Sequence, residues 1–181
     1  LSLEDVVNTD IIIPTVPISI YEEQLNAISN LIKKDALIVD VASVKVHTTN
    51  AIKKYLPDSV DILSTHPMFG PDSSDNGNNY KNLKFIYWNE RIKNKKRADD
   101  FLQFWNELGC ELIELSPDEH DKQAAYTHAF AFLIGKLGMK MNIRRNYIST
   151  KGFEGLLYNQ EAVENDTGQL FDDMMNYNPY V

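Results

Sequence analysis

Polar side chains capable of acid–base chemistry follow two apolar runs of this sequence. His66 lies in "STHPMFGPDS", shortly after the apolar run "VDIL", and a proline follows it. Ser43 and Lys45 lie in "DVASVK", after the run "ALIV". Histidine is the natural general base near neutral pH, and a serine hydroxyl can orient the base or a substrate. The three residues therefore form a candidate catalytic group.

Each of these residues also has a plain structural interpretation. Ser43 could cap a helix, Lys45 could be a solvated helical residue, and His66 could be a packed core histidine. Their combination favours a site, because the carboxyl ends of parallel strands meet at one edge of a sheet. That edge is where α/β proteins bind ligands.

The remaining histidines carry weaker signals. His47 is expected on a helix surface, and His120 with Asp121 opens a long predicted helix, where an acidic residue is favourable for the helix dipole alone. His128 follows His120 by eight residues, so the two can share a helix face. Because neither an i,i+4 histidine pair nor a cysteine partner accompanies them, we predict no metal site.

The elements that position these residues alternate between strand and helix. Residues 10–17, 36–43 and 60–64 are continuous apolar runs, typical of strands covered on both faces. Residues 18–34 and 44–56 have helical periodicity between them. Strand–helix alternation predicts a parallel, doubly wound, Rossmann-like sheet.

The rest of the first domain continues this pattern after a polar excursion. Residues 71–82 are rich in glycine and asparagine and predict an exposed loop. A strand over 83–88, a helix around 98–108 and a strand over 110–116 follow. We therefore place the end of the α/β domain, 1–116, at this point.

A second domain is predicted over 117–181. Ser116 is a candidate N-cap, Pro117 occupies the first helical position and Glu119 completes a capping box. From there to the last residue only helical periodicity is visible. The fold class is thus α/β, a partial Rossmann-like sheet followed by an all-helical domain.

Composition excludes several classes of function. The chain is 43% apolar and 24% charged with a formal charge of −8, which argues against nucleic acid or an anionic membrane as the main partner. The basic run at 91–97 has acidic neighbours and fits a solvated helix start. No apolar run approaches the ~20 residues of a membrane span. The single cysteine, Cys110, fits a reducing compartment, and we expect a cytoplasmic protein.

Two further features indicate that part of a larger fold is absent from the chain. It begins at Leu1 and reaches an apolar strand within a few residues, and no G-x-G-x-x-G follows an early strand. We therefore expect a fragment, or a processed or engineered chain. It would retain the second half of a dinucleotide-binding sheet, the half that carries the nicotinamide side.

Four motifs in order resemble the prephenate/arogenate dehydrogenases of tyrosine synthesis. These are "DVASVK", "THPMFGPDS", "EHDKQAAYTH" and "STKGFEGLL", and the resemblance covers about 10 to 178. It is strongest to the plant-type arogenate dehydrogenases, and "THPMFGP" is its most specific motif. The resemblance implies a nucleotide-binding domain followed by a helical domain through which two subunits form a homodimer.

The implied reaction is an oxidative decarboxylation with NADP or NAD. Hydride leaves a ring carbon for the cofactor, carbon dioxide leaves, and the ring becomes aromatic. The resemblance implies that His66 activates the ring hydroxyl and that Ser43 hydrogen-bonds at the same place. Residues expected to contact the cofactor are Thr15, Pro17 and Ser43, and those expected to contact the small-molecule substrate are Lys45, His128, Lys151 and Asp166.

The helical domain departs from the pattern of bacterial relatives. A second histidine one turn beyond His128 is replaced by Ala131 and Phe132, and an expected arginine by Tyr158. Cationic alternatives are Lys151, Arg144 and Arg145, each of which could also be a plain surface residue.

Asp166 bears on the choice of substrate. An aspartate suits the ammonium group of arogenate better than the keto group of prephenate, although Asp166 could equally cap the next helix. We therefore expect an N-terminally truncated arogenate/prephenate dehydrogenase, with arogenate favoured. The alternatives are a non-catalytic dimeric ligand-binding remnant of that family and a hydroxy-acid dehydrogenase of the same broad architecture.

Overall fold

The computed structural model describes residues 2–71 and 73–181, and these form two compact units, Leu1–His120 and Asp121–Val181. The division falls four residues beyond the expected domain end at 116. The elements of the first unit are α1 (Leu3–Val7), β1 (Ile11–Ile12), η1 (Ile18–Ile20), α2 (Tyr21–Ile28), β2 (Leu37–Asp40), α3 (Val46–Tyr55), β3 (Asp61–Pro67), β4 (Lys84–Arg91), α4 (Lys95–Glu107), β5 (Glu111–Glu114) and the start of α5 (Pro117–Ala124). Those of the second are the rest of α5, a π-helical turn η2 (Ala125–Ala129), α6 (Phe130–Met141), α7 (Lys151–Glu164) and α8 (Gly168–Tyr177).

The sheet of the first unit has five strands in the order β1-β2-β3-β4-β5. β1, β2 and β3 are parallel, as expected, but β4 runs antiparallel to β3, and β5 is parallel to β4. The expectation of a parallel sheet was therefore wrong for two strands, β4 and β5, which run opposite to β1, β2 and β3. A parallel return requires a crossover, usually a helix. The described residues of 68–83 form no helix or strand, so the chain turns back beside β3.

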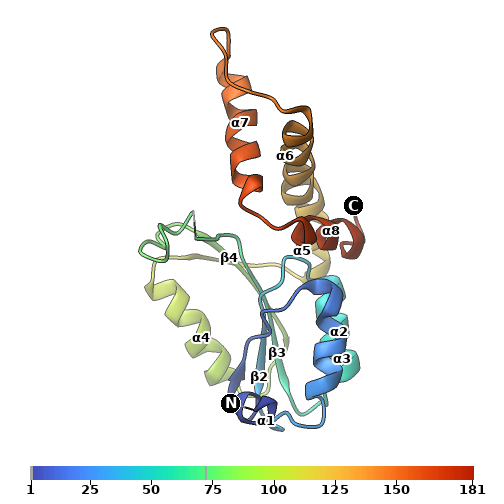
Figure 1. The fold of residues 1–181 in the computed structure, drawn as a ribbon. Coiled ribbons are helices and arrows are strands. Elements are labelled where there is room, and N and C mark those ends of the chain that lie inside the picture. The colour runs from blue at the N-terminus through green and yellow to red at the C-terminus, as the bar shows by residue number, and fades with distance from the viewer. Residues whose placement is uncertain (1, 72) are drawn as a thin grey trace. The chain divides into compact units, whose positions relative to one another are not determined.

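Helices cover both faces of this sheet (Figure 1), which confirms the Rossmann-like α/β class. On one face, α2 and α3 pack against β1 to β3 through a core that includes Leu25, Ile38 and Ile52. On the other face, α4 packs through Leu102 against Leu63 and the aromatic residues of β4. The continuous apolar runs of the inner strands are explained by this burial on both faces.

Two strand boundaries differ from expectation in ways that affect the site. The predicted strand over 10–17 is reduced to Ile11–Ile12, because Pro14 and Pro17 have no N–H to donate to a neighbouring strand. β3 continues past its predicted end to Pro67, with His66 paired to Ile86 of β4. His66 therefore lies within a strand and not in the loop after it.

The second unit is helical, as predicted. The capping box predicted at the start of α5 is present: Ser116 Oγ accepts from the N–H of Glu119, and the Glu119 carboxylate accepts from the N–H of Ser116 at 3.2 Å. α6 and α7 pack as a hairpin, in which the amide of Asn159 donates to the carbonyl of Ala131 at 2.8 Å. None of the helices over 2–71 and 73–181 is long and apolar enough to cross a membrane.

Candidate active site at the carboxyl ends of β2 and β3

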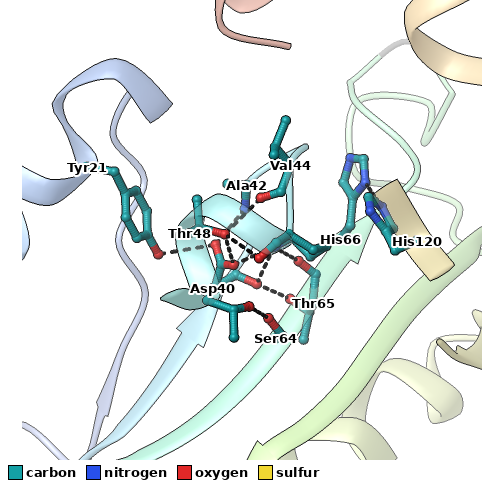
Figure 2. A network of polar contacts seen from close by, with 11 residues as sticks. Tyr21, Asp40, Ala42, Val44, Thr48, Ser64, Thr65, His66 and His120 are labelled. Carbon is teal, nitrogen blue, oxygen red and sulfur yellow. Dashed lines mark hydrogen bonds and ion pairs between the residues drawn. The ribbon is translucent and has the colours of Figure 1, made fainter. Parts of the chain in front are cut away.

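His66 contacts a second histidine near the carboxyl end of β3. Its Nδ1 atom lies 2.8 Å from Nε2 of His120, and the ring planes are inclined by 63°. Both residues are buried, with 4% and 3% of their surface exposed. Figure 2 shows the two rings beside each other, His66 from β3 and His120 from the first turn of α5. The sequence spacing of these residues gave no indication that they would meet.

A buried ion pair contacts the residue that precedes His66 in β3. Lys45 Nζ donates to Asp40 Oδ2 at 2.6 Å and to the carbonyl of Thr65 at 2.6 Å. The side chains of Lys45 and Asp40 are 2% and 0% exposed. Thr65 in turn donates its hydroxyl to the carbonyl of Asp40 at 2.8 Å. The pair therefore joins the last residue of β2 to the residue that precedes His66.

The carboxylate of Asp40 is satisfied by hydrogen bonds as well as by charge. It accepts from the hydroxyls of Thr48 at 2.5 Å and Tyr21 at 3.1 Å, and from the backbone N–H of Ala42 at 3.0 Å (Figure 2). A buried charge is tolerated only when it is paired and hydrogen-bonded in this way. Burial, with the adjacent negative Asp40, raises the pKa of the Tyr21 phenol well above its ordinary value.

Ser43 is not a helix cap and Lys45 is not a solvated residue, the two plain structural roles that the sequence allowed. The N-cap of α3 is Lys45, not Ser43, and the Lys45 side chain makes no capping hydrogen bond. Ser43 is half-buried in the loop between β2 and α3. Lys45 is not a solvated helical residue, because the hydrogen bonds of its ammonium group point into the protein. The acceptors of this ammonium include the carboxylate and the backbone carbonyl of Asp40 and the carbonyl of Thr65. The substrate contact by Lys45 stays a prediction.

Thr15 and Pro17, the predicted cofactor contacts, are exposed in the segment after β1. Since β1, β2 and β3 are parallel, this segment leaves the sheet at the same edge as Asp40 and His66. Nucleotides bind at this edge of doubly wound sheets.

The predicted substrate residues of the helical unit fall at different places. His128 lies in η2, half-buried, with its ring against Phe132 at 5.3 Å between centroids. Asp166 follows the end of α7, and Lys151 is exposed at its beginning. With a rise of ~1.5 Å per residue, Lys151 and Asp166 are separated by about 20 Å. The two residues therefore lie near opposite ends of α7, and their substrate contacts stay predictions. Asp166 is not the cap of α8, because Thr167 occupies that position.

The residues that sequence reasoning missed are Asp40, Thr48, Tyr21 and His120. For Asp40 a signal existed: an aspartate ends the apolar run "ALIVD", and burial at that position demands a cation nearby. The pairing of His120 with His66 depends on the return of β5 through the sheet, which no local pattern encodes. Across the described parts of the chain, no group of three His, Cys, Asp or Glu side chains could hold a metal ion.

The fold and this edge define a nucleotide-binding α/β domain of the Rossmann type, followed by a helical unit. The family model described as "Prephenate dehydrogenase, nucleotide-binding domain" matches residues 1–114. The chain therefore belongs to the prephenate dehydrogenase family, as the sequence motifs indicated.

Two curated relatives from Arabidopsis thaliana match most of the chain. Arogenate dehydrogenase 1, chloroplastic, is 39% identical over 82% of this chain and 23% of its own length. Arogenate dehydrogenase 2, chloroplastic, is 36% identical over 82% of this chain and 42% of its length. The chain thus spans less than half the length of these relatives.

Solved structures of the same class share the fold. Prephenate dehydrogenase from Aquifex aeolicus, in complex with hydroxyphenyl propionate and NAD+, has a TM-score of 0.71 at 19% identity, over 97% of this chain and 63% of that chain. Synechocystis arogenate dehydrogenase has a TM-score of 0.70 at 17% identity, over 98% of this chain and 66% of that chain.

Proposed function

We propose that this chain is part of an arogenate or prephenate dehydrogenase, which carries out the NADP- or NAD-dependent oxidative decarboxylation of a cyclohexadienol. The observation that supports this most directly is His66: a histidine buried at the ligand-binding edge of a nucleotide-binding sheet, with its Nδ1 held by His120. Membership of the family supplies the substrate class.

In the proposed reaction His66 accepts the proton of the ring hydroxyl through Nε2, because Nδ1 is engaged by His120. Ser43, in the loop that follows β2, hydrogen-bonds the same hydroxyl and orients it. As the proton leaves, the C–O bond gains carbonyl character, hydride departs from the same carbon, and loss of carbon dioxide aromatises the ring. A positioned general base contributes on the order of 10²–10⁴ in rate.

The described residues fit one side of a nicotinamide dinucleotide. Thr15 and Pro17 are exposed at the edge where such cofactors bind, and Ser43 lies at the end of the neighbouring strand. The sequence has no G-x-G-x-x-G turn to receive the pyrophosphate. When bound, the nicotinamide supplies the hydride acceptor. The chain's own residues orient the substrate hydroxyl and hold its proton.

Arogenate is the favoured substrate. Asp166 is a carboxylate that does not cap α8, so the simplest structural alternative for it no longer applies. Its negative charge suits the ammonium of arogenate, which prephenate lacks. Asp166 and His128 lie toward the same end of the α6–α7 hairpin, since the end of α7 packs against the beginning of α6.

A homodimer through the helical unit is supported by an exposed apolar face on α6. We call the following residues the α6 stripe: Phe130, Leu133, Leu137 and Met141, of which 58%, 47%, 49% and 65% is exposed. Their spacing of three or four residues puts them on one side of the helix. α7 packs against a different side, at Gly135. A second copy of the chain is the partner that covers this stripe in the proposal.

The cellular location of the protein stays a prediction. The single cysteine fits a reducing compartment such as the cytoplasm, whereas the two plant relatives are named chloroplastic.

A non-catalytic, dimeric ligand-binding remnant of the family is the second candidate. It predicts substrate-analogue binding without cofactor binding, and it assigns no proton transfer to His66.

Calorimetric titration of the chain tests both candidates. NADP+, NAD+ and a hydroxyphenyl substrate analogue are titrated separately and together into the wild type, His66→Ala and the control His47→Ala, a histidine on α3. We expect analogue binding that is weakened at least tenfold by His66→Ala and unchanged by His47→Ala. Cofactor binding at micromolar strength favours the enzyme, and analogue binding alone favours the remnant. No analogue binding at all contradicts both.

A further inference from the structure

The contact between His66 and His120 determines where hydrogen can reside on each ring. A neutral imidazole has one N–H donor and one acceptor nitrogen. At 2.8 Å between His66 Nδ1 and His120 Nε2, one hydrogen occupies the space between them. If His66 donates it, His66 Nε2 carries no hydrogen and is the acceptor nitrogen of the ring. If His120 donates it, His66 Nε2 must carry hydrogen.

Only the first arrangement makes His66 a base toward a ligand. We propose that His120 is a positioning residue that accepts the Nδ1 hydrogen of His66 and so fixes the tautomer in which Nε2 is unprotonated. This inference rests on the proposed function for its catalytic meaning, but the tautomer itself is a property of the free protein. When Nε2 takes up the substrate proton, His66 becomes an imidazolium, and its existing Nδ1–H hydrogen bond to His120 becomes charge-assisted and stronger.

The fold holds both rings firmly enough for such a role. His66 is paired with Ile86 in the sheet, and the residue before it is held by Lys45. His120 is fixed through β5, which pairs with the same β4, and through the capping box between Ser116 and Glu119. β4 thus pairs on one side with β3, which carries His66, and on the other with β5, which leads to His120. A short N–N contact between two buried rings then persists without a ligand.

The contact also limits the charge of the pair. Two imidazolium rings would direct N–H groups at each other across this distance, so the contact as observed holds at most one positive charge. When His66 carries that charge, His120 remains the neutral acceptor as long as the contact is kept. Its expected action is on the orientation and tautomer of the base, not on the substrate.

Nitrogen NMR of the imidazole side chains tests this inference directly. In the ¹⁵N-labelled chain, long-range ¹H–¹⁵N correlation at about pH 8.5, some two units above the ordinary histidine pKa, distinguishes the two neutral tautomers. Single substitutions of the four histidines assign the signals. We expect His66 in the Nδ1–H form.

Two variants of His120 separate a tautomer effect from a packing effect. His120→Glu supplies an atom that can only accept when ionised, so His66 should stay in the Nδ1–H form. His120→Leu removes the acceptor, so His66 should shift to the Nε2–H form that free imidazole prefers. A wild-type His66 in the Nε2–H form, or an unchanged tautomer in His120→Leu, overturns the inference. If His120→Leu fails to fold, the wild type and His120→Glu still decide.

The outcome is independent of the proposed function. No cofactor or substrate enters the NMR experiment, so failure of analogue binding leaves the tautomer result standing. Conversely, analogue binding with His66 in the Nε2–H form would support the family function and reject the role of His120.

Discussion

At the scale of single residues, the backbone around His66 is held by buried polar groups on β2 and α3. Lys45 connects the carboxylate of Asp40 to the carbonyl of Thr65, and Thr65 returns a hydrogen bond to the Asp40 backbone. Neither charge reaches solvent. Such a pair contributes little net stability compared with apolar residues of the same volume, but removal of one partner is costly.

The first prediction concerns this ion pair. Lys45→Met removes the cation and leaves the Asp40 carboxylate buried with hydroxyl and N–H donors only. We expect a loss of about 3–5 kcal/mol in the free energy of unfolding. Urea denaturation at neutral pH measures it. Lys53→Met, at a partly exposed ion pair with Glu90, is the control and should cost less than about 1 kcal/mol. Equal losses in both variants would contradict the structural role of Lys45.

A second prediction follows from the raised pKa of Tyr21. Below its ordinary value of 10.0, the phenol is protonated in both the folded and unfolded states, so its hydrogen bond to Asp40 is fully present. Above that pH the unfolded phenol ionises first, and stability is lost until the higher folded-state pKa is passed. Relative to Tyr21→Phe, the wild type should lose up to about 1.4 kcal/mol per pH unit above pH 10. Parallel curves of unfolding free energy against pH for the two proteins would refute this.

The chemistry of the site was only partly readable from these residues. His66 and Ser43 stand in two motifs whose residue types suggest proton transfer, and the apolar run before each motif was sufficient to place them near strand ends. Lys45 is indistinguishable by sequence from a surface lysine, since a helix start is a common place for solvated cations. Its burial depends on Thr65 and Asp40, which are 20 and 5 residues away. The position of His120 beside His66 could not be predicted without knowing the path of β4 and β5 through the sheet.

At the scale of elements, close packing of α6 on α7 requires a glycine. A Cβ added at Gly135 would lie 2.7 Å from Cγ2 of Val163, whereas a Cβ at Gly155 in α7 would meet nothing within 4 Å. These two positions form a matched pair within one hairpin. Substitution by alanine raises the helix propensity equally at both positions, but only at Gly135 does the added methyl group meet a neighbouring side chain.

The third prediction uses this pair. Gly135→Ala should destabilise the chain by about 1–3 kcal/mol, because the helices must separate to admit a methyl group. Gly155→Ala should stabilise it by about 0.5–1 kcal/mol, because alanine has the higher helix propensity. Urea unfolding followed by far-ultraviolet circular dichroism distinguishes the two. Stabilisation by both substitutions would mean that the hairpin is looser than the structure indicates.

Elements whose signals are local were predicted well, and those whose limits depend on partners were not. The capping box and Pro117 located the start of α5 to the residue. β3, by contrast, extends through His66 because β4 pairs with it, and the direction of β4 was set by a connection without a helix. Apolar runs do not indicate whether a neighbouring strand is parallel. The register of β4 therefore had to come from the structure.

At the scale of the whole molecule, the helical unit leaves the α6 stripe uncovered by the described residues of its own unit. Contiguous exposed apolar surface of this kind marks interaction sites in soluble proteins. In an isologous dimer each stripe residue would occur twice, once from each subunit. The effect of a charge introduced there is thereby doubled, which makes the stripe a sensitive test of assembly.

The last prediction is that Leu133→Glu combined with Leu137→Glu converts a dimer into a monomer. The double substitution would place four carboxylates in the interface, and like charges there cost several kcal/mol. Light scattering after gel filtration should give about twice the chain mass of 20.7 kDa for the wild type and the chain mass for the variant. Phe104→Glu, an equally exposed apolar residue of α4, is the matched control and should remain dimeric. A monomeric wild type, or dissociation caused by the control substitution alone, would contradict the proposal that the α6 stripe is the dimer interface.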